Sequence, residues 1–200
     1  MNSEKYDSTQ DTKMHIETIR GFLGEVQENV SARMLIHDGS KLEEPEKSMY
    51  DEFTPKLKDS TYGSDEYKSF LANMGTALQH HYQVNSHHPE HYKMFQCPVC
   101  ETVFRENESP VSSVLVGEIR ICQKCSPTGA LIMECALEPA SGIYGMSLLD
   151  LIEMLADWKA ATARHADGDI LKSIEINKKR FEIPDQLVGI FLNTLRELNW

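Results

Sequence analysis

Apolar residues recur at steps of three and four along much of the chain, which is the spacing of helices with one buried stripe. The first such stretch begins at about Thr12, after a polar segment over residues 1–11 that is expected to be a loose arm. A second short helix is expected over residues 32–38, ending at Gly39. The buried stripe of the first stretch is predicted to consist of His15, Ile19, Phe22, Val26 and Val30.

Residues 42–63 interrupt this spacing with acidic residues and prolines, and they are expected to form a loop with at most one helical turn. Ser64 then begins a further helical stretch, which continues until Pro89 ends it. His81 falls in the apolar series of this helix and is therefore expected to point inward.

The helical spacing returns after Ser147, which is expected to cap a helix over residues 148–164. One edge of this helix is apolar and includes Trp158. A different edge carries acidic residues at helical spacing, and the one next to Trp158 is expected to be the most inward. These acidic residues are Asp150, Glu153 and Asp157.

Residues 94–144 have a different character, with alternating β-branched residues that predict strands over 111–121 and 130–137. Two Cys-x-x-Cys pairs lie in this segment, twenty-one residues apart. Paired thiolates in two tight turns are typical of a structural zinc site in a zinc ribbon, and a redox pair or two disulfides are the alternatives. The fifth cysteine, Cys135, is expected to pack as a small apolar residue. The predicted zinc ligands are Cys97, Cys100, Cys122 and Cys125.

Length and composition favour one helical domain, over 12–93 and 145–200, that carries the 94–144 ribbon as an insert. Of the 200 residues, 40% are hydrophobic, which suffices for a core. The formal charge of -11 argues against broad electrostatic binding to nucleic acid. No apolar run approaches the roughly 20 residues that span a bilayer, and the first residues lack the apolar core of a signal peptide, so a cytoplasmic protein is expected.

The pair His37-Asp38 stands at the end of an apolar run, directly before Gly39. It can simply mark the end of a helix, but imidazole and carboxylate are also ligands for Zn, Fe, Mn or Co. Five of the eight histidines lie between residues 80 and 91, and this density favours a metal ligand among them. His15, the His37-Asp38 pair, the histidine group and Asp157 together supply the ligand types that one cation needs.

This order of residues resembles that of the HD-domain metal-dependent phosphohydrolase superfamily, in which a His, a His-Asp pair, optional histidines and a final Asp lie on a helical bundle. The runs Tyr62-Gly63-Ser64, Asn85 to His91 and Asp150 to Ala160 also resemble a family of phage and bacterial proteins of unknown function. The resemblance covers about residues 12–93 and 145–198. It implies a mainly α fold, an HD-like helical bundle with a small inserted β-ribbon.

The resemblance also implies roles for individual residues. One ion would be held by His15, His37, Asp38 and Asp157. A second ion, bridged by Asp38, would be held by His81 and His88, with His87 as a further candidate. The short gap between His81 and His88 keeps a mononuclear site open. Lys41 would contact a phosphate, and Asp38 or Glu153 would orient the attacking water.

Three functions follow as expectations. The first is hydrolysis of a nucleotide or a related small phosphoester by water activated on one or two divalent ions of Mn, Fe, Co, Ni, Mg or Zn. The second keeps the ligands and is an HD-type di-iron oxygenase. The third is a non-enzymatic module that binds a protein partner, or a second copy of the chain, through the zinc ribbon; few basic residues lie there, so nucleic acid is disfavoured.

Overall fold

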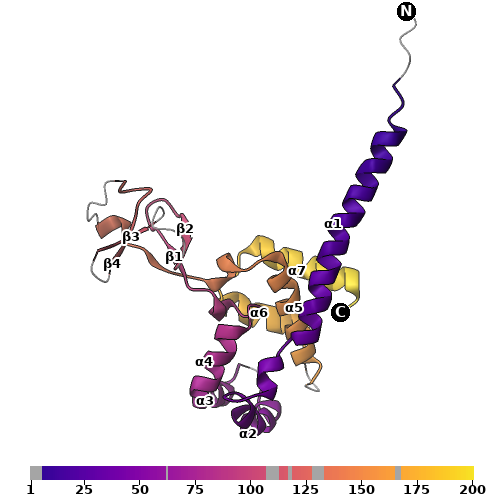
Figure 1. Cartoon of the computed structure of the whole chain (residues 1–200). Coiled ribbons are helices and arrows are strands. Elements are labelled where there is room, and N and C mark those ends of the chain that lie inside the picture. Colours follow the sequence, from indigo (N-terminus) through magenta and orange to yellow (C-terminus); the bar gives the residue numbers. More distant parts are fainter. Residues whose placement is uncertain (1–5, 62, 107–112, 117–118, 128–132, 165–167) are drawn as a thin grey trace, which may run out of the picture. The chain divides into compact units, whose positions relative to one another are not determined.

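The computed structural model describes residues 6–61, 63–106, 113–116, 119–127, 133–164 and 168–200, which form a mainly helical fold with a small β module (Figure 1). By its internal contacts the chain divides into two units, Met1–His37 and Asp38–Trp200. This division falls inside the segment 12–93 that the sequence assigns to one helical domain.

The described part of the first unit, residues 6–37, contains one helix, α1 (Thr9–Ile36), so the expectation of two helices is wrong. Asn29 and Ser31 were the expected caps of the second helix. Instead their side chains donate to the carbonyl oxygens of Glu25 and Gln27, at 2.9 and 2.8 Å, so they continue the helix rather than start one. Because α1 begins at Thr9, the described part of the N-terminal arm is shorter than predicted.

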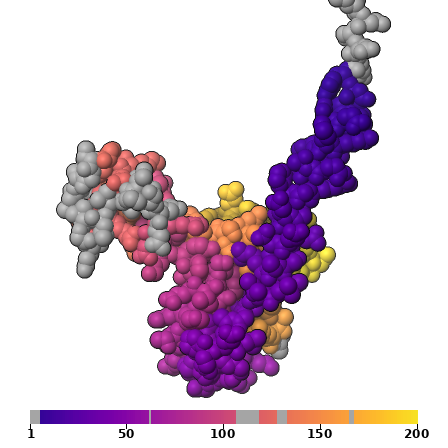
Figure 2. All heavy atoms as spheres, in the orientation of Figure 1, coloured from indigo at the N-terminus to yellow at the C-terminus, as the bar shows by residue number. Residues whose placement is uncertain are grey.

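The apolar stripe of α1 is not buried, contrary to the sequence expectation. No described residue of this helix is classed as buried, and Phe22 is 59% exposed. In the space-filling view α1 is a rod of side chains (Figure 2). Spacing of apolar residues predicted the helix correctly, but spacing alone does not supply a partner for the apolar face.

The second unit starts with a 3₁₀ turn, η1 (Gly39–Leu42), and a helix, α2 (Lys47–Asp59), where the sequence predicted a loop. Tyr50, Phe53 and Leu57 recur at helical spacing, and Phe53 is buried. Burial of a Phe side chain contributes about 1.5–3 kcal/mol, which offsets much of the cost of Pro55 inside the helix.

The predicted helix after Ser64 is divided into α3 (Asp65–Asn73) and α4 (Gly75–Val84). The Ser64 side chain caps α3 as expected, by accepting from the Tyr67 amide at 3.1 Å. Met74 lies between the two helices, and Gly75, the first residue of α4, has a φ of +51°, a conformation that glycine adopts at little cost. The segment after α4 leads to a 3₁₀ turn, η2 (Pro89–His91).

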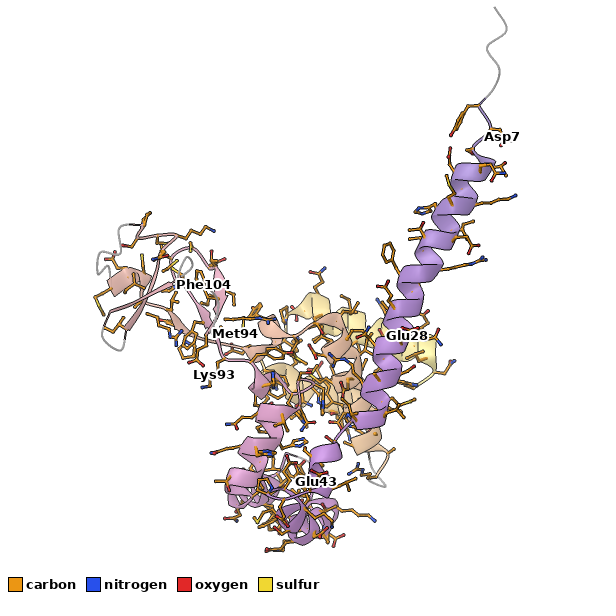
Figure 3. The ribbon with its side chains drawn as sticks, viewed as in Figure 1. Asp7, Glu28, Glu43, Lys93, Met94 and Phe104 are labelled. Atoms are coloured by element: carbon orange, nitrogen blue, oxygen red, sulfur yellow. The ribbon has the colours of Figure 1, made fainter. Side chains whose placement is uncertain are left out.

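The described residues of the β module form two small antiparallel sheets. One has the order β2-β1-β5, formed by β1 (Met94–Gln96), β2 (Val103–Arg105) and β5 (Glu138–Ala140). The other is the pair β3 (Ser113–Val116) and β4 (Ile119–Cys122). Lys93 and Met94 mark the entry of the chain into the module, and Phe104 of β2 lies in its small core (Figure 3).

The sequence predicted the β module but misplaced its strands. The expected strand over 111–121 is two strands; residues 111, 112, 117 and 118 lie outside the described part of the chain. Of the expected strand over 130–137, residues 130–132 also lie outside it, and Met133–Cys135 form a 3₁₀ turn, η3.

The remaining residues form η4 (Gly142–Gly145) and three helices, α5 (Leu148–Thr162), α6 (Ile170–Arg180) and α7 (Asp185–Leu198). Their core is centred on Trp158, whose ring meets Phe191 edge-on at 6.1 Å and stacks with Phe181 at 6.4 Å. A Cβ atom on Gly142 would lie 1.8 Å from the Pro89 carbonyl oxygen, so only glycine lets η4 approach η2 this closely.

Candidate metal centres

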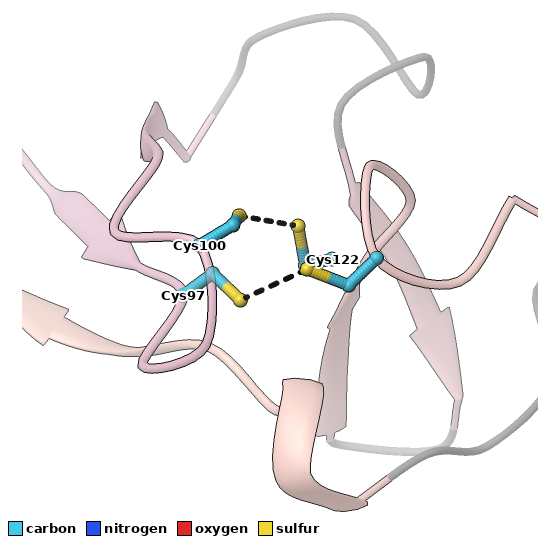
Figure 4. A group of neighbouring side chains, drawn as sticks. Cys97, Cys100 and Cys122 are labelled. Atoms are coloured by element: carbon cyan, nitrogen blue, oxygen red, sulfur yellow. Dashed lines mark hydrogen bonds between the residues drawn. The ribbon is translucent and has the colours of Figure 1, made fainter.

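Four cysteines of the β module come together as the sequence predicted. The Sγ atoms of Cys97 and Cys125 lie 3.8 Å apart, and those of Cys100 and Cys122 lie 3.7 Å apart (Figure 4). Four sulfur atoms placed tetrahedrally about 2.3 Å from one ion would be about 3.8 Å from each other. A disulfide needs a separation of about 2.05 Å, and all four cysteines are free. This group can therefore hold a tetrahedral metal ion.

Two tight turns present these thiols. The Glu101 amide donates to the Cys97 carbonyl at 2.8 Å, and the Ser126 amide donates to the Cys122 carbonyl at 2.9 Å. Each turn thus carries one Cys-x-x-Cys pair. Cys135 is 4% exposed and packs in the core of the module, which fits the role expected for the odd cysteine.

A second group of possible ligands lies in the helical part of the second unit, around Asp38. The Asp38 Oδ1 atom is 3.4 Å from His81 Nε2 and 3.6 Å from His87 Nε2. His88 Nε2 lies 2.8 Å from His81 Nε2. One ligand atom from each of the four residues lies within 4.8 Å of the others, so the group can hold a metal ion.

Local structure brings these residues from distant parts of the chain. Asp38 has a φ of +57°, a left-handed conformation that Asp tolerates better than most residues, and the chain turns there into η1. His81 lies in the last turn of α4. His87 and His88 follow in the short segment that Pro89 ends.

The helix α5 adds two carboxylates, which face the same way because they are four residues apart. Glu153 Oε1 lies 3.2 Å from His87 Nδ1. A carboxylate oxygen of Asp157 lies within 4.8 Å of one of Asp38. Lys41 forms an ion pair with Asp38, so a cationic side chain lies beside the group.

The sequence suggested Asp157 as the most inward of the three acidic residues of α5. The most buried of them is instead Asp150, which is 2% exposed. Burial alone would raise the pKa of Asp150, but hydrogen bonds from Ser147, Ser86 and Tyr92 outweigh it and hold the pKa well below its usual range. This carboxylate therefore holds the segment around the histidines against α5.

Burial keeps the imidazoles of His81 and His88 neutral at pH 7, which is the form that binds metals. Burial lowers the pKa of His88 to about 2 and, with a contribution from the charge of Lys41, lowers that of His81 to about 4. His81 is 1% exposed and His87 is 2% exposed.

His15 and His37 belong to the first unit. His15 is exposed in the second turn of α1, whereas His37 follows the helix, and its amide donates to the Arg33 carbonyl at 2.8 Å. At 1.5 Å per residue, the 22 residues from His15 to His37 span about 33 Å of continuous helix. The structure therefore does not bring His15 to the His37-Asp38 pair.

Sequence reasoning missed Glu46, which lies next to the histidine group. Its side chain is fully buried and contacts the Nδ1 atoms of His80 and His81 at 2.8 and 3.0 Å. The available signal was weak, since Glu46 is the last of three acids around Pro45 in a segment that was expected to be a loop.

The fold and the two groups define a mainly helical protein that has a tetra-cysteine β module and a separate His, Asp and Glu group able to hold metal. The chain belongs to a family of unknown function, DUF5662, whose model matches residues 4–197. Comparisons with curated proteins and with solved structures gave no match. Among the described residues, no helix is both long and apolar enough to cross a membrane.

Proposed function

We propose that the group around Asp38 holds one or two divalent metal ions and that the protein hydrolyses a nucleotide or a related small phosphoester. Support comes from one observation, the meeting of three imidazoles and a carboxylate with ligand atoms within 4.8 Å. The order of these residues also resembles that of the HD superfamily. The proposed ligands are Asp38, His81, His87, His88 and Asp157, with His37 as the chain neighbour of Asp38.

These residues fit a divalent ion by their chemistry, because neutral imidazole and carboxylate suit Mn, Fe, Co, Ni and Zn, and carboxylate also suits Mg. When bound, such an ion supplies Lewis acidity that lowers the pKa of water from about 15.7 to about 7. Lys41 would bind a phosphoryl oxygen and take up part of its negative charge. Glu153, which contacts His87, would orient either that ring or the attacking water.

We also propose that the four cysteines hold a structural zinc ion. The sulfur separations of 3.7 and 3.8 Å match a tetrahedral thiolate site, and zinc is the ion that most often occupies such a site. The ion would stabilise a module whose own apolar core is small.

A metal analysis combined with a substrate screen tests the phosphohydrolase. The full chain is stripped of weakly bound metal and supplied in turn with Mn, Mg, Co, Ni, Fe and Zn. Release of phosphate is then measured from mono-, tri- and cyclic nucleotides, the last with a phosphatase added. We expect release with at least one ion, and a loss of about 100-fold or more for Asp38→Ala and His88→Ala, because a metal centre contributes several kcal/mol.

His91→Ala is the matched control. His91 belongs to the same histidine-rich segment, but its ring contacts the Tyr82 carbonyl at 3.2 Å and is not part of the ligand group. Absence of release from every nucleotide with every ion would refute the phosphohydrolase. Two irons per chain with uptake of dioxygen would favour the oxygenase instead. Unchanged metal content in Asp38→Ala and His88→Ala would leave the β module as the functional part.

A further inference from the structure

Glu46 is a fully buried carboxylate next to the histidine group. Burying such a group is costly unless hydrogen bonds replace its water. Three donors do so here: Ser40 Oγ and His81 Nδ1 lie 3.0 Å from Oε2, and His80 Nδ1 lies 2.8 Å from Oε1. Glu46 therefore links Ser40 of η1 to His80 and His81 of α4.

The neighbouring Asn85 decides which atoms of this network carry protons. Its Nδ2 atom lies 2.9 Å from the His81 carbonyl oxygen, which can only accept, so the amide must present its NH₂ group there. The second NH₂ proton has two acceptors within reach, Ser40 Oγ at 2.9 Å and His81 Nδ1 at 3.0 Å, and the shorter contact assigns it to Ser40. Ser40 can then donate its own proton to Glu46.

The contact with the Glu46 carboxylate then determines the tautomer of His81. A carboxylate carries no proton, so the 3.0 Å contact between Glu46 and His81 Nδ1 requires that Nδ1 be the donor. A neutral imidazole has one N–H group, so Nε2 must carry the lone pair. That lone pair faces Asp38 Oδ1 at 3.4 Å and His88 Nε2 at 2.8 Å.

We propose that Glu46 is a positioning residue for the metal centre: it holds His81 as the Nδ1–H tautomer, with Nε2 directed at the ion. Hydrogen bonds from the second ring nitrogen to a carboxylate are a general means of orienting metal-bound histidines. The proposal rests on metal binding at the Asp38 group, as proposed above, but concerns a residue outside that ligand set.

The same arrangement occurs a second time, on an unrelated element. Glu153 of α5 lies 3.2 Å from His87 Nδ1, and His87 Nε2 lies 3.6 Å from the same Asp38 oxygen that His81 approaches. Two carboxylates from different elements thus contact the Nδ1 atoms of two histidines whose Nε2 atoms both approach Asp38 Oδ1. Chance contacts between acids and histidines would not require this convergence.

Two measurements on the full, zinc-loaded chain test the role of Glu46. Nitrogen-15 NMR of the histidine rings, before any further metal is added, reports the tautomer of His81. Binding of Mn²⁺, followed by electron paramagnetic resonance, reports affinity at the Asp38 group, because this ion prefers oxygen and nitrogen ligands to thiolates. The test variant is Glu46→Gln, and the control is Glu44→Gln, an exposed acid whose side chain contacts Ser48.

We expect His81 to be the Nδ1–H tautomer in the wild type and in Glu44→Gln. In Glu46→Gln the amide presents one acceptor and one donor, so it cannot accept from both His80 and His81, and the tautomers of the two rings should mix. Affinity for Mn²⁺ should fall about 10- to 100-fold. The Glu44→Gln control should stay within about twofold of the wild type.

An Nε2–H tautomer of His81 in the wild type would overturn the proposal. So would a folded Glu46→Gln variant whose Mn²⁺ affinity changes less than about threefold. If Glu46→Gln does not fold, the wild-type tautomer still decides. A wild type that binds neither Mn²⁺ nor any other ion of the activity screen at this group, while His81 is Nδ1–H, would refute the proposed metal centre. It would leave the orienting contact of Glu46 in place, so the two failures are distinguishable.

Discussion

Asp150 offers the sharpest test of how the structure holds its histidine segment. Its Oδ2 atom accepts from Ser147 N at 2.7 Å, Ser147 Oγ at 2.6 Å and Tyr92 Oη at 2.8 Å, and its Oδ1 atom accepts from Ser86 Oγ at 2.7 Å. Ser86 and Tyr92 flank the segment that carries His87 and His88. Replacing Asp150 with Asn keeps the shape of the side chain and removes its charge.

The size of the effect follows from these four hydrogen bonds. A bond to a charged group contributes about 1.5–3 kcal/mol and a neutral one about 0.5–1.5, so the loss is about 1 kcal/mol per bond. The amide oxygen can take the place of Oδ2, and the amide nitrogen can donate to Ser86. We therefore expect a loss of about 2–4 kcal/mol in the free energy of unfolding, or about 5–15 °C in Tm.

Urea unfolding at pH 7, followed by far-UV circular dichroism, measures this loss. The control is Asp51→Asn, which removes an exposed ion pair with Lys47 and should cost no more than about 1 kcal/mol. A cost below 1 kcal/mol for Asp150→Asn, or one equal to that of the control, would refute the view that this carboxylate fastens the histidine segment to α5.

Three further predictions follow. Because the folded state lowers the pKa of Asp150, the advantage of the wild type over Asp150→Asn should be constant from pH 8 to about 5 and shrink below about pH 4, as unfolding measured across this range would show. Gly142→Ala should lower Tm by several degrees, since its Cβ would meet the Pro89 backbone, whereas Gly189→Ala, with nothing within 4 Å, should not lower it. Cys122→Ser should lose the zinc that Cys135→Ser retains, as measured by mass spectrometry of the metal content.

Much of the fold could be predicted because many signals are local. The cap at Ser147 and the apolar spacing around Trp158 gave α5 almost to its ends. The two Cys-x-x-Cys pairs predicted that their four thiols lie close together, because a tetrahedral site needs all four. In contrast, α2 was missed because two prolines suggested a loop, and only the burial of Phe53 against other elements reveals why a helix forms there.

The candidate site was predictable in its ligand types and not in its supporting residues. The His37-Asp38 pair and the density of histidines pointed to Asp38, His81, His87 and His88, which the structure brings together. His15 was included among the candidate ligands partly because it lies on an apolar stripe that was expected to be buried, but α1 does not bury that stripe. Glu46 has only a weak signal in the sequence, because its role depends on a contact across 35 positions of the chain.

The pairing of β1 with β5 has a consequence for how the length of this protein can vary. Met94 pairs with Ala140 and Gln96 with Glu138, so the chain leaves the helical part and returns to it through neighbouring strands, about 5 Å apart. The segment between β1 and β5 can be lengthened, shortened or replaced by a tight turn without moving the two points at which the chain leaves and re-enters the helical part. The module is therefore a natural point for grafting a foreign loop, and for engineering a smaller chain that keeps the histidine group.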